Sequence, residues 1–303
     1  MQAAFLNLDN ALAGQPALRE CARQKNARLV EAADLGPAFR LWARPGSLQG
    51  LSERLRDHLP TGEGARLVFA GSGDFHHVTP ALLARALEVE PGPVCVVHVD
   101  NHPDWVRYGG GVHCGSWVGV AARTAGVAKV ITIGVCSPDV GRGRRRAGDL
   151  FLVSCHRHVI YAYRSPDGGG LLTIGDESRP TIEAAGLAQF IDQLLADITT
   201  SAVYITIDKD ALRPADAATN WDQGRMSADE LLAILARIAE RHRIIGADVV
   251  GDWSRPVYGG GLLASAMKRG EAMLDQPWRA PVDANRVNEA VNLRLLEFFA
   301  EAA

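Results

Sequence analysis

The sequence predicts an α/β fold, in which a mainly parallel sheet of about eight strands carries helices on both faces. Short apolar runs alternate with amphipathic segments along the 303 residues. Residues 94–99 are apolar almost throughout, which is typical of a strand buried on both faces. Acidic residues and histidines directly follow several such runs, and open α/β sheets bind ligands at the carboxyl ends of their strands. We expect one domain over residues 1–303.

The predicted strands are runs rich in aliphatic, β-branched and aromatic residues. The run at 66–70 leads into a glycine-containing segment, and those at 94–99 and 202–208 lead into aspartates. Strands are expected at residues 3–8, 66–70, 94–99, 129–135, 151–163, 171–174, 202–208 and 244–250.

The predicted helices show apolar residues at helical spacing or a start signal. Thr79 followed by Pro80 is typical of an N-cap with proline at the first helical position. Ser227 and Glu230 have the spacing of a capping box. Helices are expected at residues 16–24, 48–58, 79–87, 117–125, 182–198, 227–242 and 282–300.

Composition excludes several classes of protein. The formal net charge of −3 gives no support for a nucleic-acid partner or an acidic membrane surface. No apolar run approaches the roughly 20 residues that span a bilayer, and the N-terminus lacks the basic region of a signal peptide. The 5 cysteines are scattered and odd in number, which suits reduced thiols rather than a disulfide framework. We therefore expect a soluble cytoplasmic protein.

Potential metal ligands gather at three predicted strand ends. In an extended chain, residues i, i+2 and i+4 point the same way, so the residues of the central cluster are expected to emerge together. Aspartates at strand ends often cap the next helix, but three clusters in succession favour metal binding. Carboxylates with a few imidazoles suit Mn²⁺, Mg²⁺ or Zn²⁺, and a pair of hard ions would activate a shared water. The clusters are Asp74 with His76 and His77; Asp100 with His102 and Asp104; and Asp208 with Asp210.

Taken in order, these clusters resemble the signatures of the ureohydrolase (arginase/agmatinase) superfamily. The family's motifs are Gly-Gly-Asp-His, Asp-Ala-His-x-Asp and Asp-x-Asp-x-x-Asp-Pro. Their counterparts here are residues 73–77, 100–104 and 208–214, and the similarity extends over about residues 66–255. The resemblance implies the three-layer arginase-like α/β fold and two bound metal ions, with Mn²⁺ expected and Zn²⁺ or another divalent ion as alternatives.

The resemblance also implies roles for individual residues. One metal ion would be held by His76 or His77, Asp100, Asp104 and Asp208, and the other by His102, Asp100, Asp208 and Asp210. Asp100 and Asp208 would bridge the two ions. His113 is similar to the family's acid/base histidine, which protonates the departing amine. The catalytic candidates are His113, Asp104 and Asp252.

Three departures from the family pattern stand out. The first motif has an additional residue, which leaves both His76 and His77 open as the ligand. Arg213 replaces the aspartate that precedes proline in the third motif. The family's guanidinium-binding glutamate falls at Gly251, and Asp252, one residue further, is the candidate replacement.

The resulting hypothesis is a hydrolase of linear amidines, which cleaves non-peptide C–N bonds of a guanidino or amidino substrate through a metal-bridging hydroxide. One alternative is a single-zinc deacetylase-like amidohydrolase on the related fold, and another is a non-catalytic relative. The expected partner is a small molecule, with neither nucleic acid nor membrane. Family members often form homo-oligomers, and the sequence fixes no number of subunits.

Weaker signals indicate other chemistry. Residues 155–158 combine a cysteine with two histidines but lack a partner pair at zinc spacing. Cys114 beside His113 is a candidate nucleophile, but a cysteine hydrolase would not need the aspartate clusters. The arginines at 142–146 are interpreted as a solvated loop. Aromatic residues after the strand-end motifs are candidates for a pocket wall: Trp105, Tyr108, Trp221 and Trp253.

Overall fold

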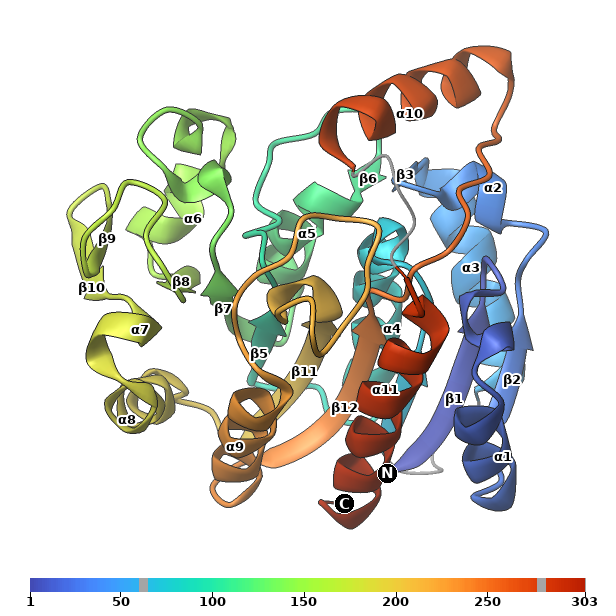
Figure 1. Cartoon of the computed structure of the whole chain (residues 1–303), viewed down its shortest axis with the longest axis horizontal. Coiled ribbons are helices and arrows are strands. Elements are labelled where there is room, and N and C mark those ends of the chain that lie inside the picture. Colours follow the sequence, from blue (N-terminus) through green and yellow to red (C-terminus); the bar gives the residue numbers. More distant parts are fainter. Residues whose placement is uncertain (60–64, 277–281, 303) are drawn as a thin grey trace.

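The computed structural model describes residues 1–59, 65–276 and 282–302 and contains one eight-stranded sheet (Figure 1). Every neighbouring pair in this sheet is parallel. In spatial order its strands are β2 (Arg28–Glu31), β1 (Gln2–Asn7), β4 (Arg66–Phe69), β12 (Arg243–Val250), β11 (Ala202–Asp208), β5 (Val94–Val99), β7 (Val127–Val135) and β8 (His158–Ala162). The predicted α/β fold class is confirmed.

Helices cover both faces of this sheet, which gives three layers (Figure 1). One face packs against α1 (Pro16–Gln24), α8 (Leu187–Asp197), α9 (Ala228–Ala239) and α11 (Ala284–Glu301). The other packs against α3 (Pro45–His58), α4 (Thr79–Leu87) and α5 (Trp117–Arg123). Alternate residues of β5 enter the two cores, Val97 on one side and Val96 on the other. The strand is therefore apolar throughout because both of its faces are buried.

Smaller elements connect these layers. The short strands β3 (Trp42–Ala43) and β6 (Val112–His113) pair with each other, as do β9 (Leu171–Ile174) and β10 (Glu177–Pro180). The short helices are α2 (Gly36–Phe39), α6 (Leu150–Ser154) and α7 (Ile182–Ala185). The helix α10 (Leu262–Asp275) lies at the edge of the molecule opposite the two termini (Figure 1). Among the described residues, no helix combines the length and apolar character needed to span a bilayer.

The register of the central strands brings their carboxyl ends level. Ile207 of β11 pairs with Val99 of β5, and Val249 of β12 pairs with Phe69 of β4. The residues that follow these strands therefore leave the sheet at one edge, as parallel pairing requires. This alignment gathers the candidate ligands.

Several sequence expectations need correction. Residues 151–163 contain part of α6 followed by β8, rather than one β segment. The helix expected at 182–198 is interrupted at Gly186, whose φ of 78° lies in the left-handed region. Thr79 is the first residue of α4 rather than its N-cap, and its hydroxyl donates to Asp248 instead. The elements β2 and α10 were not anticipated, whereas the capping box of Ser227 and Glu230 is confirmed.

Candidate metal centre

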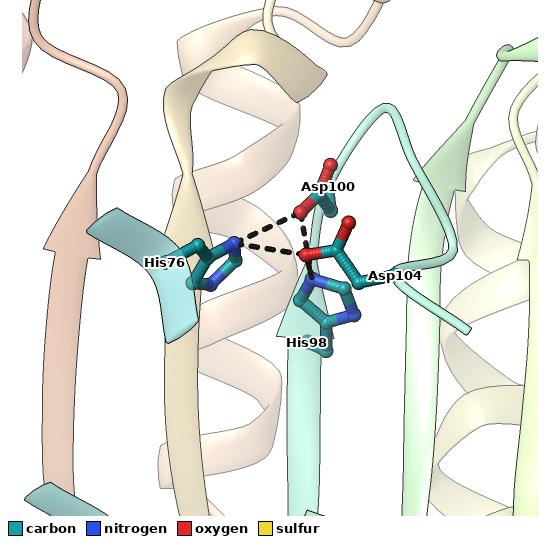
Figure 2. Close-up of side chains that lie close together, drawn as sticks. All are labelled: His76, His98, Asp100 and Asp104. Carbon is teal, nitrogen blue, oxygen red and sulfur yellow. Dashed lines mark hydrogen bonds and ion pairs between the residues drawn. The ribbon is translucent and has the colours of Figure 1, made fainter. Parts of the chain in front are cut away.

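Histidines and aspartates from three strand ends meet at the carboxyl edge of the sheet. His76 lies in the 3₁₀ turn Gly73–Val78 after β4, and its Nδ1 is 3.1 Å from Asp100 Oδ2. The same nitrogen is 3.3 Å from Asp104 Oδ2 and 3.7 Å from Asp208 Oδ2. Figure 2 shows the His76 ring directed at Asp100 and Asp104. These four side chains are buried, and ligand atoms of His76, Asp100, Asp104 and the neighbouring His98 lie within 4.8 Å of one another, as one potential ligand set.

A second set lies beside the first and shares Asp100. His102 Nδ1 is 2.9 Å from Asp210 Oδ2 and 3.6 Å from Asp100 Oδ1. Ligand atoms of Asp100, His102 and Asp210 lie within 4.8 Å of one another. Asp222, which the sequence did not single out, accepts a hydrogen bond from His102 Nε2 at 2.9 Å. A carboxylate that accepts a hydrogen bond from the second ring nitrogen of a metal-binding histidine orients that histidine.

The tautomer of His76 suits metal binding. The Thr206 hydroxyl donates to Asp248 at 2.8 Å, so it accepts the hydrogen bond from His76 Nε2, also 2.8 Å long. A proton therefore sits on Nε2, and Nδ1 faces the carboxylates. In the absence of a cation, the effect of burial on the pKa of His76 is outweighed by Asp100 and Asp104, which raise this pKa well above its usual value. Nδ1 is buried and has no hydrogen-bond partner among the described residues. A buried imidazole nitrogen that faces three carboxylates is the arrangement expected of a metal ligand.

His98 is a site residue that the sequence reasoning missed. Its Nε2 lies 2.8 Å from Asp100 Oδ2, and because a carboxylate only accepts, the histidine donates (Figure 2). Its Nδ1 then accepts from the Thr132 hydroxyl at 2.9 Å, and this hydroxyl accepts from His158 Nε2 at 2.8 Å. Burial lowers the pKa of His98 to about 4 despite the opposing effect of Asp100. The sequence signal that could have identified His98 is its position on the buried strand, two residues before Asp100.

The carboxylates of the two sets are crowded in a buried site. Burial and the neighbouring Asp100 raise the pKa of Asp104 to about 8 and that of Asp208 to about 6. They also raise the pKa of Asp210 well above its usual range. For Asp100 itself, burial is outweighed by His98, His102 and His76, which hold its pKa well below the usual value. This donor set fits two divalent cations that share Asp100, since cations would offset the repulsion between carboxylates.

The central cluster does not converge by strand alternation, as the sequence reasoning supposed. β5 ends at Val99, and the loop after it carries the ligands. Asp104 adopts a φ of 46°, and its Oδ2 accepts a hydrogen bond of 2.6 Å from Trp117 Nε1. The left-handed backbone and this indole therefore turn Asp104 back toward His76.

His77 belongs to neither ligand set. Its ring stacks on Phe39 with a centroid distance of 6.2 Å, and neither of its buried nitrogens has a hydrogen-bond partner in the described part of the chain. Burial is the main cause that lowers its pKa well below the usual value, and the nearby Lys268 ammonium acts in the same direction. Of the two alternatives left by the sequence, the structure brings His76 to the cluster and directs His77 into the core.

Asp252 is also turned away from the site, contrary to the expectation that it replaces the family's glutamate. Its Oδ1 forms an ion pair of 2.8 Å with Lys209 Nζ and accepts a hydrogen bond of 2.6 Å from Gln15 Nε2. All three residues are fully buried. Gly251 lies next to the metal ligands instead: a Cβ there would be 2.4 Å from Asp208 Oδ1. Arg213 points outward and pairs with Asp216 at 2.7 Å.

A cavity of about 560 Å³ opens onto both ligand sets. His113 lines it, and its Nδ1 accepts a hydrogen bond of 2.8 Å from the Gly115 amide. Since the other nitrogen then carries the proton, Nε2 donates to Glu271, a second residue that the sequence did not indicate. Three of the four aromatic candidates also line the cavity, namely Trp105, Tyr108 and Trp221.

The structure does not support the catalytic interpretation of Cys114 or the metal-binding interpretation of residues 155–158. Burial raises the pKa of the Cys114 thiol well above its usual value, which opposes a thiolate nucleophile. His158 is buried against Thr132, whereas His156 is exposed and lies near Glu177, so residues 155–158 do not converge on a common metal. All five cysteines are free thiols.

The family model described as Arginase family matches residues 178–251. An uncharacterized protein of Thermotoga maritima is 26% identical over 186 residues, which cover 61% of this chain and 58% of the relative. The match therefore spans less than two thirds of that protein's length.

Solved structures show the same fold at low sequence identity. A Bacillus subtilis arginase superposes with a TM-score of 0.61 at 14% identity, over 96% of this chain and 95% of the other. A Medicago truncatula arginase gives 0.60 at 15%, over 99% and 86%. A hypothetical agmatinase from Burkholderia thailandensis gives 0.58 at 16%, also over 99% and 86%. These structures show that the chain has the arginase-like fold, and the matching family model supports its similarity to the ureohydrolase (arginase/agmatinase) superfamily.

Proposed function

We propose that this protein is a binuclear metal-dependent hydrolase that cleaves a C–N bond of a linear guanidino or amidino compound. The observation that carries this proposal is the pair of adjacent ligand sets, His76 with Asp104 and His102 with Asp210, which share Asp100 at the base of one cavity. Two bound divalent cations would supply an activated water nucleophile at neutral pH. Mn²⁺ is our first candidate, and Zn²⁺ or another divalent ion is the alternative.

The protein's own groups would complete the reaction. Asp100 and Asp208 would bridge the cations, while Thr206 and Asp222 hold His76 and His102 in position. His113 would transfer a proton at Nε2, since the Gly115 amide occupies its other nitrogen. A proton must reach the departing amine because an unprotonated nitrogen is a poor leaving group.

The walls of the cavity favour a small cationic substrate. Its volume of about 560 Å³ suits a small molecule. Carboxylates that lie outside the two ligand sets add negative charge to its walls, namely Asp222, Glu271 and Asp275, whereas Asp139 is paired with Arg144 at 3.8 Å. A protonated guanidinium or amidinium would be attracted to this lining.

Metal analysis and a substrate screen test the proposal. The full-length protein is treated with a mild chelator, reloaded with Mn²⁺ and analysed for bound metal, and we expect two ions per chain. Guanidino, amidino and N-acylated compounds are then screened for release of urea, ammonia or amine. One zinc ion with turnover of N-acyl compounds would favour the deacetylase-like alternative. Two ions without turnover of any compound would favour a non-catalytic relative, and a protein that binds no divalent ion would exclude the proposal.

A cytoplasmic location, assembly into a homo-oligomer and a single domain over residues 1–303 remain predictions from the sequence. The free thiols are consistent with a reducing compartment. Size-exclusion chromatography with light scattering tests the oligomeric state directly.

A further inference from the structure

The helix α10 contributes two carboxylates to the cavity, and one of them, Glu271, contacts His113. Glu271 Oε1 accepts a hydrogen bond from His113 Nε2, although 158 positions separate the two residues in the sequence. The Glu271 side chain is 29% exposed, and it lines the cavity together with Asp275, one turn further along α10. Glu271 therefore lies beside the group that we propose to transfer the proton.

The position of Glu271 is fixed by an anchor on the same helix. Lys268 is fully buried, and its Nζ donates to Trp42 O at 3.0 Å and to Ala38 O at 2.5 Å. The ammonium also lies 4.3 Å from the Trp42 ring centroid. Trp42 pairs with His113 across β3 and β6. Lys268 and Glu271 lie three residues apart on α10. Lys268 thus contacts β3 and Glu271 contacts β6, the two strands of one small sheet.

One oxygen of this carboxylate remains available. Within the described ranges, the hydrogen bond to His113 engages Oε1, and no partner is found for Oε2. The two residues that follow β12 offer no carboxylate to the cavity. Gly251 has no side chain, and Asp252 is paired with Lys209 in the protein interior. Asp222 is already engaged by His102 and Asn101.

We propose that Glu271 is the specificity-determining carboxylate that receives the cationic guanidinium or amidinium of the substrate. This inference rests on the proposed function, because it assigns the substrate-binding charge within the same cavity. A cation held by Glu271 would lie next to His113, so that the departing nitrogen is close to the proton donor. The helix α10 would thereby supply the charge that the end of β12 lacks.

Binding of a cation and its neutral isostere tests this assignment without requiring turnover. Calorimetry on the Mn²⁺-loaded full-length protein compares n-butylguanidinium with n-butylurea, for wild type, E271Q, E271D and D275N. We expect wild type to prefer the cation, and E271Q to lose this preference by about tenfold or more, since a charge-assisted pair is removed. E271D should retain part of the preference. D275N is the comparison variant because it removes another carboxylate of the cavity wall, and its loss of preference should be much smaller than that of E271Q, at about twofold.

The outcomes separate this inference from the proposed function. Wild type that binds both probes equally, E271Q that keeps the preference, or D275N that loses as much as E271Q would each overturn the assignment. A cation preference that depends on Glu271, in a protein that hydrolyses none of the screened compounds, would support the assignment while the hydrolase proposal fails. Unchanged metal content and melting temperature in E271Q would show that the lost preference comes from Glu271 itself.

Discussion

Lys209 and Asp252 form a fully buried ion pair of 2.8 Å directly behind the metal ligands. Lys209 lies between Asp208 and Asp210 in the chain. Its side chain points into the core beside α11, where its Nζ also donates to Asn292 at 2.8 Å. Burial lowers the pKa of Lys209, and Asp252 opposes this shift. The pair connects the turn that carries two ligands to the end of β12 and to α11.

The losses of stability on removing each member of this pair should not be additive. In K209M or D252N the remaining polar group loses its partner in the core, and we expect a loss of about 3–5 kcal/mol in the free energy of unfolding. The double variant K209M/D252N should lose less than the sum of the two single variants. Urea denaturation of all three proteins measures the coupling, and strictly additive losses would contradict a direct interaction.

The neighbouring histidines His76 and His77 should respond oppositely to replacement by phenylalanine. H76F removes a ligand nitrogen, so we expect loss of at least one bound metal ion. H77F should retain the wild-type metal content, because neither nitrogen of His77 has a hydrogen-bond partner and its ring stacks on Phe39. Metal analysis after reloading with Mn²⁺ measures both effects. Loss of metal in H77F with full occupancy in H76F would reverse our assignment of the ligand.

Gly251 is required by the geometry around Asp208. Its φ is 89°, and a Cβ would be 2.4 Å from Asp208 Oδ1 and 2.6 Å from Lys209 N. We expect G251A to destabilise the fold by about 1–3 kcal/mol and to weaken metal binding, because backbone strain and a displaced ligand act together. Thermal unfolding and metal titration provide the measurements.

A glycine elsewhere provides the control for this substitution. Gly50 lies within α3, and a Cβ there would have no atom within 4 Å. G50A should therefore stabilise the protein by about 0.5–1 kcal/mol through the higher helix propensity of alanine. Equal effects of G251A and G50A would show that the crowding around Asp208 has no influence.

Removal of metal should destabilise the folded protein. The buried carboxylates of the two ligand sets repel one another unless cations or protons intervene. We expect the melting temperature to fall on treatment with EDTA and to rise again with Mn²⁺, with about 2.7 kcal/mol gained at a hundredfold excess over Kd. The variant D208A, which loses a shared ligand, should show little of this response. A melting temperature that is independent of Mn²⁺ in the wild type would count against the metal centre.

The sequence by itself determined the parallel α/β class, the central strands and the edge at which chemistry gathers. Apolar runs such as 202–208 report burial on both faces, and local patterns such as Ser227 with Glu230 specify where helices begin. Polar residues that follow parallel strands must emerge at one edge, so the meeting of Asp100, Asp208 and Asp210 was predictable.

Only the tertiary structure decided which side chains face the cavity. The choice of His76 over His77, the inward turn of Asp252 and the support of Asp100 by His98 depend on side-chain directions that packing against other elements sets. The contact between His113 and Glu271 joins residues 158 positions apart, and no local pattern encodes a pairing at that distance. Periodicity and propensity act over a few residues, whereas these contacts form only once the layers have packed.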